Sequence, residues 1–290
     1  MSTEITAKQN LESIITSPIV VKNLNDCLGS EKKASAFASS VISVVTGNHR
    51  LRVAEPMSII GAAMVAATLD LPVIPTLGEA YIIPYNDSRR GVTMAQFQIG
   101  WKGLYQLCIR SGQFKNIIAE PVHEGELVKA DVFTGEFIFD SSKKKSEKVI
   151  GYMANFQLVN GFSKTDYWSL EKVKAHATRY SQAYRQGRDT PWVTDFDSMA
   201  KKTVLKNLLN RFAPKSIEME NALRFDQAVV NVAKNSDNIT EDDLNIDSFD
   251  GEKYIDNDSN PTEEEKAQAD NDVNNAIAKV EKALRKQDAK

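Results

Sequence analysis

The spacing of apolar residues along the 290-residue chain changes twice. Up to about residue 70, and again from about residue 195, apolar side chains recur every three or four positions, which is typical of helices with one buried face. Between about residues 80 and 168 they alternate with polar side chains, which is typical of strands. The pattern predicts an α+β fold in which helices pack against an antiparallel or mixed sheet.

The N-terminal part of the chain predicts helices. Residues 1–30 predict a loose helical segment, and a helix follows from about Lys32 to Val45. Pro56 opens a further helix over Met57–Leu69, because proline has no N–H to lose at the first helical position. Small residues line one side of this helix, so we expect it to pack closely against its neighbours.

Strands and turns predominate in the middle of the chain. Tyr81–Tyr85 and Thr93–Ile99 are predicted strands, with Gln96 and Gln98 on one face of the second. A helix over Trp101–Arg110 follows, and Gly100 and Gly103 at its start allow another backbone to approach closely. Further strands are predicted at residues 116–123, 132–139, 149–159 and 162–168, the last two joined by an Asn160-Gly161 hairpin, and further helices at 169–180 and near 221–234.

The helix predicted over Asp195–Pro214 combines an apolar stripe with positive charge. Lys202, Lys206 and Asn210 follow one another at steps of four, so we expect them to form one polar ridge. Lys201 falls on the apolar side, where a charge is costly unless a partner pairs with it. A polyanion bound by this helix would supply that partner.

Charge is distributed unevenly behind an overall net charge of −3. Residues 1–71 are neutral, residues 72–235 carry a net charge of +6, and residues 236–290 carry −9. The chain therefore has a basic body and an acidic tail. A basic body is compatible with nucleic-acid binding even though the averaged charge of the molecule hides it.

These changes in pattern and charge predict four segments. Residues 1–54 form a helical N-terminal arm that is expected to make oligomer contacts, and residues 55–235 form the core. Residues 236–265 are expected to be an acidic, disordered and flexible linker, because they hold few apolar residues. Residues 266–290 predict a short helix that could dock a partner. Two interpretations of the tail stay open: a solubilising linker with a docking helix, or an internal polyanion that competes with DNA for the basic surface.

Several classes of function lack their sequence signals. No uninterrupted run of about 18 apolar residues predicts a membrane span, and no secretion signal is present, so we expect a cytoplasmic protein without a membrane partner. There is no Gly-x-x-x-x-Gly-Lys-Ser/Thr loop for nucleotide hydrolysis. Cys27, Cys108 and three isolated histidines have no metal-like spacing. We therefore expect a protein that is not an enzyme, with no catalytic residue, no metal site and no required cofactor.

Cations and amides gather in clusters that suit a nucleic-acid strand. Lys102, Gln106 and Arg110 share one helix face, and the N-terminus of that helix favours an anion. A second cluster, between residues 172 and 192, interleaves cations with aromatic rings, which can bind phosphates and stack on bases. Solvated helix faces and core aromatics stay open as alternative explanations of these two clusters. Together with the Asp195–Pro214 helix, the predicted DNA contacts are Gln96, Gln98, Lys102, Tyr105, Gln106, Arg110, Lys172, Arg179, Arg185, Arg188, Lys201, Lys202, Lys206 and Arg211.

Together these clusters predict one cationic groove for a nucleic-acid strand. Lysines and arginines that neutralise phosphates release counterions, so binding is expected to weaken steeply with salt. No ordered set of base-reading side chains is evident, so binding is expected to be independent of DNA sequence.

Several collinear segments carry longer motifs. They lie at residues 64–72, 77–85, 96–103, 110–112, 191–206 and 216–219, and include Gln96-Phe-Gln-Ile-Gly-Trp-Lys-Gly103. These segments resemble the RecT family of phage single-strand DNA annealing proteins, or recombinases. Trp101 stands where relatives often carry Tyr, which keeps an aromatic ring at this position. The N-terminal arm and the tail match the family poorly.

The resemblance implies ATP-independent annealing of complementary strands by a homo-oligomer, either a ring or a helical filament, in phage homologous recombination. It also implies a core similar to that of other strand-annealing proteins and a bacterial host cell as the setting. The implied partners are single-stranded DNA, the annealed duplex, a phage 5′→3′ exonuclease and a host single-strand-binding protein. Mg²⁺ is expected at most to influence annealing.

Two alternatives stay open. The first is a passive protein that coats single-stranded DNA without pairing it. The second is a Mg²⁺-dependent nuclease, which would use acids such as Glu124, Glu126 and Asp131.

Overall fold

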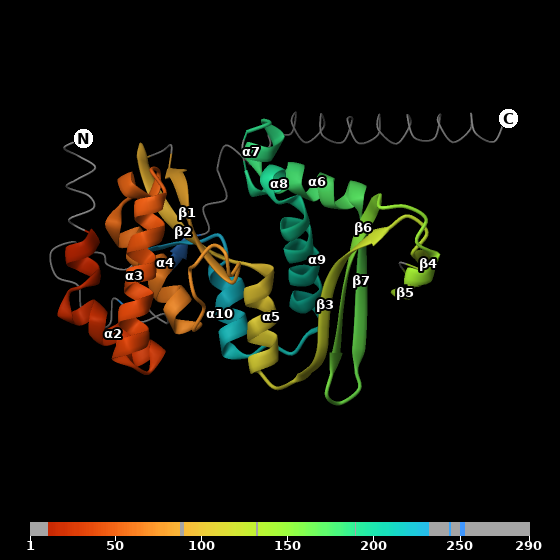
Figure 1. Ribbon diagram of the computed structural model, residues 1–290, viewed down its shortest axis with the longest axis horizontal. Helices are drawn as coiled ribbons and strands as arrows, with labels where there is room; N and C mark the ends of the chain where they lie inside the picture. Colours follow the sequence, from red (N-terminus) through yellow and green to blue (C-terminus); the bar gives the residue numbers. More distant parts are fainter. Residues whose placement is uncertain are drawn as a thin grey trace. The chain divides into compact units, whose positions relative to one another are not determined.

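Helices and antiparallel strands alternate along the chain in the computed structural model, which describes residues 11–87, 90–131, 133–188, 190–231, 244 and 250–252 (Figure 1). The chain divides after residue 253, and every described residue belongs to the first of the two units. The mixture of helices and antiparallel sheets confirms the predicted α+β class.

Helices fill the N-terminal part, namely α2 (Pro18–Leu28), α3 (Glu31–Gly47) and α4 (Pro56–Thr68). Ser30 caps α3 by accepting the Lys33 N–H at 3.3 Å, and Glu55 caps α4 by accepting the Ser58 N–H at 2.7 Å. The small side chains of α4 let its neighbours approach closely, so the helix is buried on every side from Ser58 to Ala67. Side chains of α2 and α3 share this core, so the described part of the predicted arm packs into the same unit as the predicted core.

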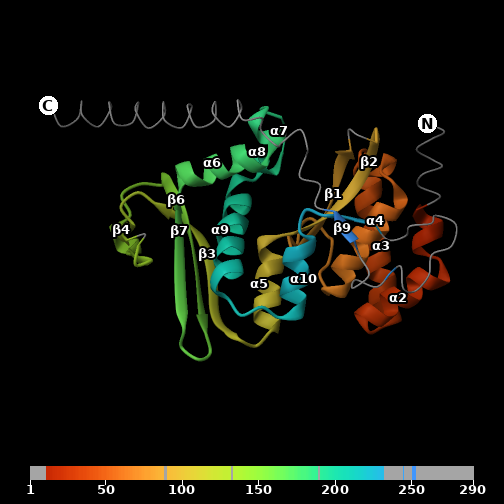
Figure 2. The same cartoon turned by 180° about the vertical axis from the view of Figure 1, so that it is seen from behind.

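An antiparallel ribbon of β1 (Ala80–Asp87) and β2 (Val92–Ile99) packs against α4 (Figures 1 and 2). The ribbon leads into α5 (Trp101–Arg110), whose bounds agree with the prediction. Gly100 and Gly103 allow the start of α5 to lie directly against the segment that precedes β1. A Cβ atom at these positions would lie 2.0 Å from the Gly78 carbonyl oxygen and 2.2 Å from that of Glu79. The predicted close approach of a backbone is confirmed, and that backbone belongs to the same chain.

A second sheet has the strand order β3–β6–β7, with antiparallel neighbours. Its strands are β3 (Phe114–His123), β6 (Val149–Leu158) and β7 (Ser163–Ser169). Alternate residues of β6, namely Tyr152, Ala154 and Phe156, are buried on the face that packs against α9 (Phe196–Phe212). Because β3 is an edge strand, it lies between the rest of this sheet and α5 (Figure 1).

Residues 127–139 form a separate hairpin of β4 (Leu127–Asp131) and β5 (Glu136–Phe139). The single interrupted strand predicted over residues 132–139 is therefore wrong. Asp131 Oδ1 accepts the N–H groups of Phe133 at 2.9 Å and Thr134 at 3.2 Å, and Gly135 has a φ of 69°. These contacts form a turn at the place where the strand was predicted to begin.

The last helices of the described chain are α6 (Leu170–Tyr180), α7 (Gln182–Arg185), α8 (Pro191–Thr194), α9 and α10 (Ile217–Phe225). The helix predicted near Asn221–Lys234 corresponds to α10, which begins four residues earlier, at Ile217, and ends nine residues earlier, at Phe225. It ends early because Gln227, at a φ of 66°, turns the chain back onto β2 and donates its N–H to the Phe97 carbonyl at 2.9 Å. The following residues form β8 (Val229–Asn231), which pairs with β9 (Asp250–Glu252).

Four positions inside the predicted acidic linker are ordered parts of the fold, which differs from the prediction of a disordered segment. Leu244 is 2% exposed, and residues 250–252 pair as β9, so these positions belong to the folded unit. The remainder of the linker predicted over residues 236–265, and the helix predicted over residues 266–290, lie outside the described residues.

Asp226 joins three elements in the interior. Its side chain is fully buried, and Oδ1 accepts the Ile99 N–H at 3.1 Å and the Lys202 ammonium at 3.0 Å, while Oδ2 accepts the Lys206 ammonium. Burial lowers the pKa of Lys202, and the two lysines hold the pKa of Asp226 below its usual range even though burial opposes its charge. Lys202 is only 9% exposed, so the polar ridge predicted for Lys202, Lys206 and Asn210 starts in the interior and not at the surface.

We expect Asp226→Ala to lower the free energy of unfolding by about 3 kcal/mol or more, because it leaves the buried Lys202 ammonium and the half-buried Lys206 ammonium without their counter-charge. Urea titration followed by circular dichroism measures this loss. Glu136→Gln is the control, since it breaks the Lys129–Glu136 pair, in which both side chains are 51% exposed. This control should leave the midpoint nearly unchanged. Equal shifts in the two variants would contradict a structural role for Asp226.

Candidate nucleic-acid interface

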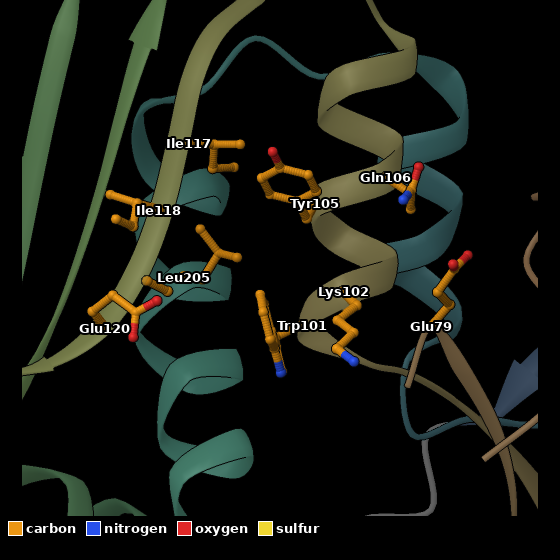
Figure 3. A pocket seen from close by; sticks show the side chains of 10 residues that line it. Glu79, Trp101, Lys102, Tyr105, Gln106, Ile117, Ile118, Glu120 and Leu205 are labelled. Carbon is orange, nitrogen blue, oxygen red and sulfur yellow. The ribbon is translucent and has the colours of Figure 1, made fainter. Parts of the chain in front are cut away.

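A pocket of about 380 Å³ lies between α5 and β3, and we name it the α5–β3 cleft. The rings of Trp101 and Tyr105 project from α5 into the space beside β3, and Leu205 of α9 closes the back (Figure 3). Tyr105 is 37% exposed. The full lining consists of Glu79, Trp101, Lys102, Tyr105, Gln106, Ile117, Ile118, Ala119, Glu120 and Leu205.

Two lysines bring positive charge to the rings of the cleft. The Lys102 ammonium lies 5.9 Å from the centre of the Trp101 ring, and the Lys201 ammonium of α9 lies 5.4 Å from it. Lys201 also donates to Glu120 at 2.8 Å, with its side chain 18% exposed and that of Glu120 50% exposed. The out-of-place charge predicted at Lys201 therefore has two partners within the chain, a carboxylate and an aromatic face.

The cleft also contains carboxylates. Glu120 lies on β3, and Glu79 lies in the segment before β1. Burial raises the pKa of Glu79, and Asp70 adds to this effect, while Arg110 and Lys102 act in the opposite direction. Aromatic faces, lysines and an apolar floor can hold a flat ring beside an anionic group, which is the chemistry of a nucleotide strand.

The structure brings four of the predicted DNA contacts to this cleft. Lys102, Tyr105 and Gln106 line it, and Lys201 borders it through Glu120. Trp101 was not among the predicted contacts, yet its ring lies in the cleft. The spacing of Trp101 and Tyr105, one helical turn apart, was the available signal. Glu120 gave no signal, because 81 positions separate it from Lys201.

Four other predicted contacts are engaged within the fold, including Lys206, whose ammonium donates to Asp226. The Arg110 guanidinium donates to the carbonyl oxygens of Leu69 at 2.6 Å and Asp70 at 3.4 Å, next to the end of α4. Gln96 is 6% exposed within the β1–β2 ribbon, and Lys202 is held by Asp226. Gln98, further along the ribbon, is half-buried. A DNA role for these five side chains stays a prediction.

The second predicted cluster forms a basic, aromatic surface on α6, α7 and α8. Lys172, Arg179, Arg185 and Arg188 are exposed there, and we name these four side chains the α6–α8 surface. Lys172 lies 4.1 Å from the centre of the Trp168 ring, and Arg179 lies 5.4 Å from that of Tyr180. The sequence left open whether the aromatics are core anchors: Trp192 is 7% exposed, whereas Tyr180 is 64% exposed. Arg211, the last predicted contact, is exposed near the end of α9.

His176 lies inside this cluster, and sequence reasoning gave it no role. Its ring is 4.5 Å from that of Tyr180, 5.5 Å from that of Trp168 and 6.4 Å from that of Trp192. Burial, with Lys206, Arg179 and Lys172, lowers the pKa of His176 to about 4. The imidazole is therefore neutral at physiological pH, and the low pKa reflects mainly its burial, with the three nearby cations adding to the effect.

The acids considered for a nuclease have structural partners. Glu126 accepts the His123 N–H at 2.6 Å, Glu124 accepts the Ser146 hydroxyl at 2.9 Å, and Asp131 forms the β4–β5 turn. Within the described ranges, no three His, Cys, Asp or Glu side chains come together as a group that could hold a metal ion. Over the same residues, no helix combines the length and apolar composition needed to cross a bilayer.

Comparison with known proteins finds a family that contains this cleft in its matched region, and two relatives. The model of the RecT family matches residues 35–244. A Bacillus subtilis (strain 168) protein described as uncharacterized protein YqaK is 43% identical over 213 residues, which cover 73% of this chain and 70% of that protein. Protein RecT of Escherichia coli (strain K12) is 28% identical over 181 residues, which cover 60% of this chain and 64% of that protein, somewhat less than two thirds of its length.

The lowered pKa of His176 predicts an acid-sensitive contribution to stability. Because its folded pKa of about 4 lies below the ordinary value of about 6.5, the contribution is complete above pH 6.5. It is lost as the pH falls from 6.5 towards 4, when the unfolded chain takes up the proton first. We expect a loss of roughly 1–2 kcal/mol after solvent screening.

Urea unfolding at several pH values checks this contribution. His176→Gln should flatten the pH dependence between pH 7 and pH 4.5. His49→Gln, which changes an exposed imidazole, should keep the wild-type profile. A His176→Gln profile parallel to the wild type would refute the assignment.

Proposed function

Because this chain belongs to the RecT family, whose members anneal single-stranded DNA in recombination, we propose that it binds a single strand in the α5–β3 cleft and pairs it with a complementary strand without ATP. The observation that carries the proposal is the meeting of Trp101, Tyr105, Lys102 and Lys201 in one cleft inside the matched region.

The chemistry of the cleft suits a strand that must remain able to pair. Lysines attract backbone phosphates without selecting a base. The aromatic rings of Trp101 and Tyr105 can stack on base faces, and stacking leaves the Watson–Crick edges open to a second strand. Binding of this kind accepts any sequence, and base pairing itself then provides specificity.

The α6–α8 surface supports a longer binding path than the cleft alone. Its four cations are exposed, and Arg179 lies beside the exposed ring of Tyr180. A single strand follows such alternation of charge and ring through non-specific contacts. We propose that this surface contacts nucleotides of the strand beyond the cleft.

Annealing needs no energy source in this scheme. The sequence has no nucleotide-binding Gly-x-x-x-x-Gly-Lys-Ser/Thr loop, and base pairing supplies the driving force. We propose that copies of the chain assemble into a ring or helical filament, so that neighbouring clefts hold the strand until enough pairs form. The proposed setting is the cytoplasm of a bacterial host, with a phage exonuclease and a host single-strand-binding protein as partners.

A fluorescence assay with complementary labelled oligonucleotides tests the function in the absence of ATP. We expect pairing to be faster with the protein than without it. Binding without acceleration would identify a coating protein, and Mg²⁺-dependent shortening of the labelled strand would identify a nuclease. Tyr105→Ala should weaken binding of the oligonucleotide about tenfold, since one stacked base is worth about 1–3 kcal/mol. Phe133→Ala is the matched control, because that ring is fully exposed on the β4–β5 hairpin and should not affect binding.

Glu120→Gln is expected to strengthen DNA binding. The Glu120 carboxylate pairs with Lys201, so it competes with a backbone phosphate for the same ammonium. Its removal should steepen the slope of log affinity against log salt by about 0.7, the value for one more phosphate contact on a single strand. Glu136→Gln is the control, because it breaks an exposed lysine–glutamate pair outside the cleft. If Glu120→Gln leaves the affinity and the salt slope unchanged, Lys201 does not contact the DNA.

A further inference from the structure

A second pocket of about 280 Å³ lies between α9 and α10, and we name it the α9–α10 pocket. Its charged lining comprises Lys206, Lys215 and Arg224 against a single carboxylate, Glu220. The lining therefore carries an excess of positive charge. In contrast to the α5–β3 cleft, it contains no aromatic side chain, and Leu223 is its apolar member.

Lys206 is held in this pocket by the interior. Its ammonium donates to Asp226, and the same carboxylate also accepts from Lys202 at 3.0 Å. One negative charge thus faces two positive charges. An ammonium has three N–H donors, and Lys206 is 30% exposed, so it can meet a further acceptor from the pocket while Asp226 fixes its position.

Lys215 and Arg224 bring further donors to the same space. The Lys215 ammonium donates to Asn210 Oδ1 at 2.9 Å, an uncharged acceptor that orients the lysine and leaves its charge in place. Arg224 contributes a planar guanidinium, whose forked donors match the geometry of a phosphate. Several cationic donors around one pocket, without a ring for stacking, suit a phosphate group better than a base.

We propose that the α9–α10 pocket binds a phosphate group at a site separate from the α5–β3 cleft. Leu205 lines the cleft and Lys206 lines the pocket, and successive residues point about 100° apart around a helix. The two sites thus use different faces of α9. The phosphate has two chemical sources, inorganic phosphate and a DNA backbone phosphate, and the second source rests on the proposed function.

The test titrates the whole chain with inorganic phosphate by calorimetry, and with an unstructured oligonucleotide at several salt concentrations. Lys215→Glu should weaken phosphate binding by about tenfold. Glu220→Gln should strengthen it, because it removes the one carboxylate of the lining. Lys32→Glu makes the same charge change as Lys215→Glu at an exposed position of α3, and it controls for the change in net charge.

The oligonucleotide titration identifies the source of the phosphate. If Lys215→Glu also lowers the salt slope by about 0.7 relative to Lys32→Glu, a backbone phosphate occupies the pocket. If phosphate binding weakens and the salt slope does not change, the pocket is a site for inorganic phosphate. Phosphate affinities of Lys215→Glu and Glu220→Gln equal to those of the wild type would overturn the proposal. If the wild-type chain binds no oligonucleotide, the proposed function is refuted. The titration with inorganic phosphate then decides by itself whether the pocket binds phosphate.

Discussion

The fully buried carboxylate of Asp226 fixes the centre of this fold. It accepts hydrogen bonds from the end of β2 and from two lysines of α9, and it lies at the end of α10. A buried ion is costly, and only complete pairing offsets that cost. Asp226 therefore restricts these three elements to one arrangement, because moving any of them would separate charges in the interior.

The placement of α9 follows from this constraint and determines both candidate sites. Lys202 is anchored inward, so Lys201 and Leu205 are turned to the α5–β3 cleft, while Lys206 and Asn210 are turned to the α9–α10 pocket. Lys201, Lys202 and Lys206 thus lie in three environments: a cleft with aromatic walls, the interior and a polar pocket. Cations that look equivalent in the sequence thus differ in burial and in the partner each one has.

Local patterns predicted the local elements well, because caps and spacing act over a few residues. Pro56 at the start of α4, the helix at residues 169–180 that corresponds to α6, and the Asn160-Gly161 hairpin were all predicted from neighbouring residues. The β4–β5 hairpin was missed because its strands are short and its turn depends on the Asp131 side chain. The early end of α10 was missed because it depends on pairing with Phe97, far away in the sequence.

The candidate site shows the same division. Spacing along one helix placed Lys102 and Gln106 together, and the apolar position of Lys201 correctly indicated that it needs a partner. No pattern could name Glu120 as that partner, since tertiary packing alone brings β3 beside α9. Lys202 was assigned to a surface ridge because a spacing of four is the same whether the side chain meets water or a buried carboxylate.

Gly100 and Gly103 have a consequence for how this protein can evolve. Their contacts with the Gly78 and Glu79 carbonyls seat the start of α5 on peptide atoms, which are the same for every amino acid. The position of the helix that carries Trp101 and Tyr105 is therefore decoupled from the side chains that line the cleft. Substitutions at those lining positions can therefore change which strands are held, and how tightly, without altering how the start of α5 rests on the segment before β1.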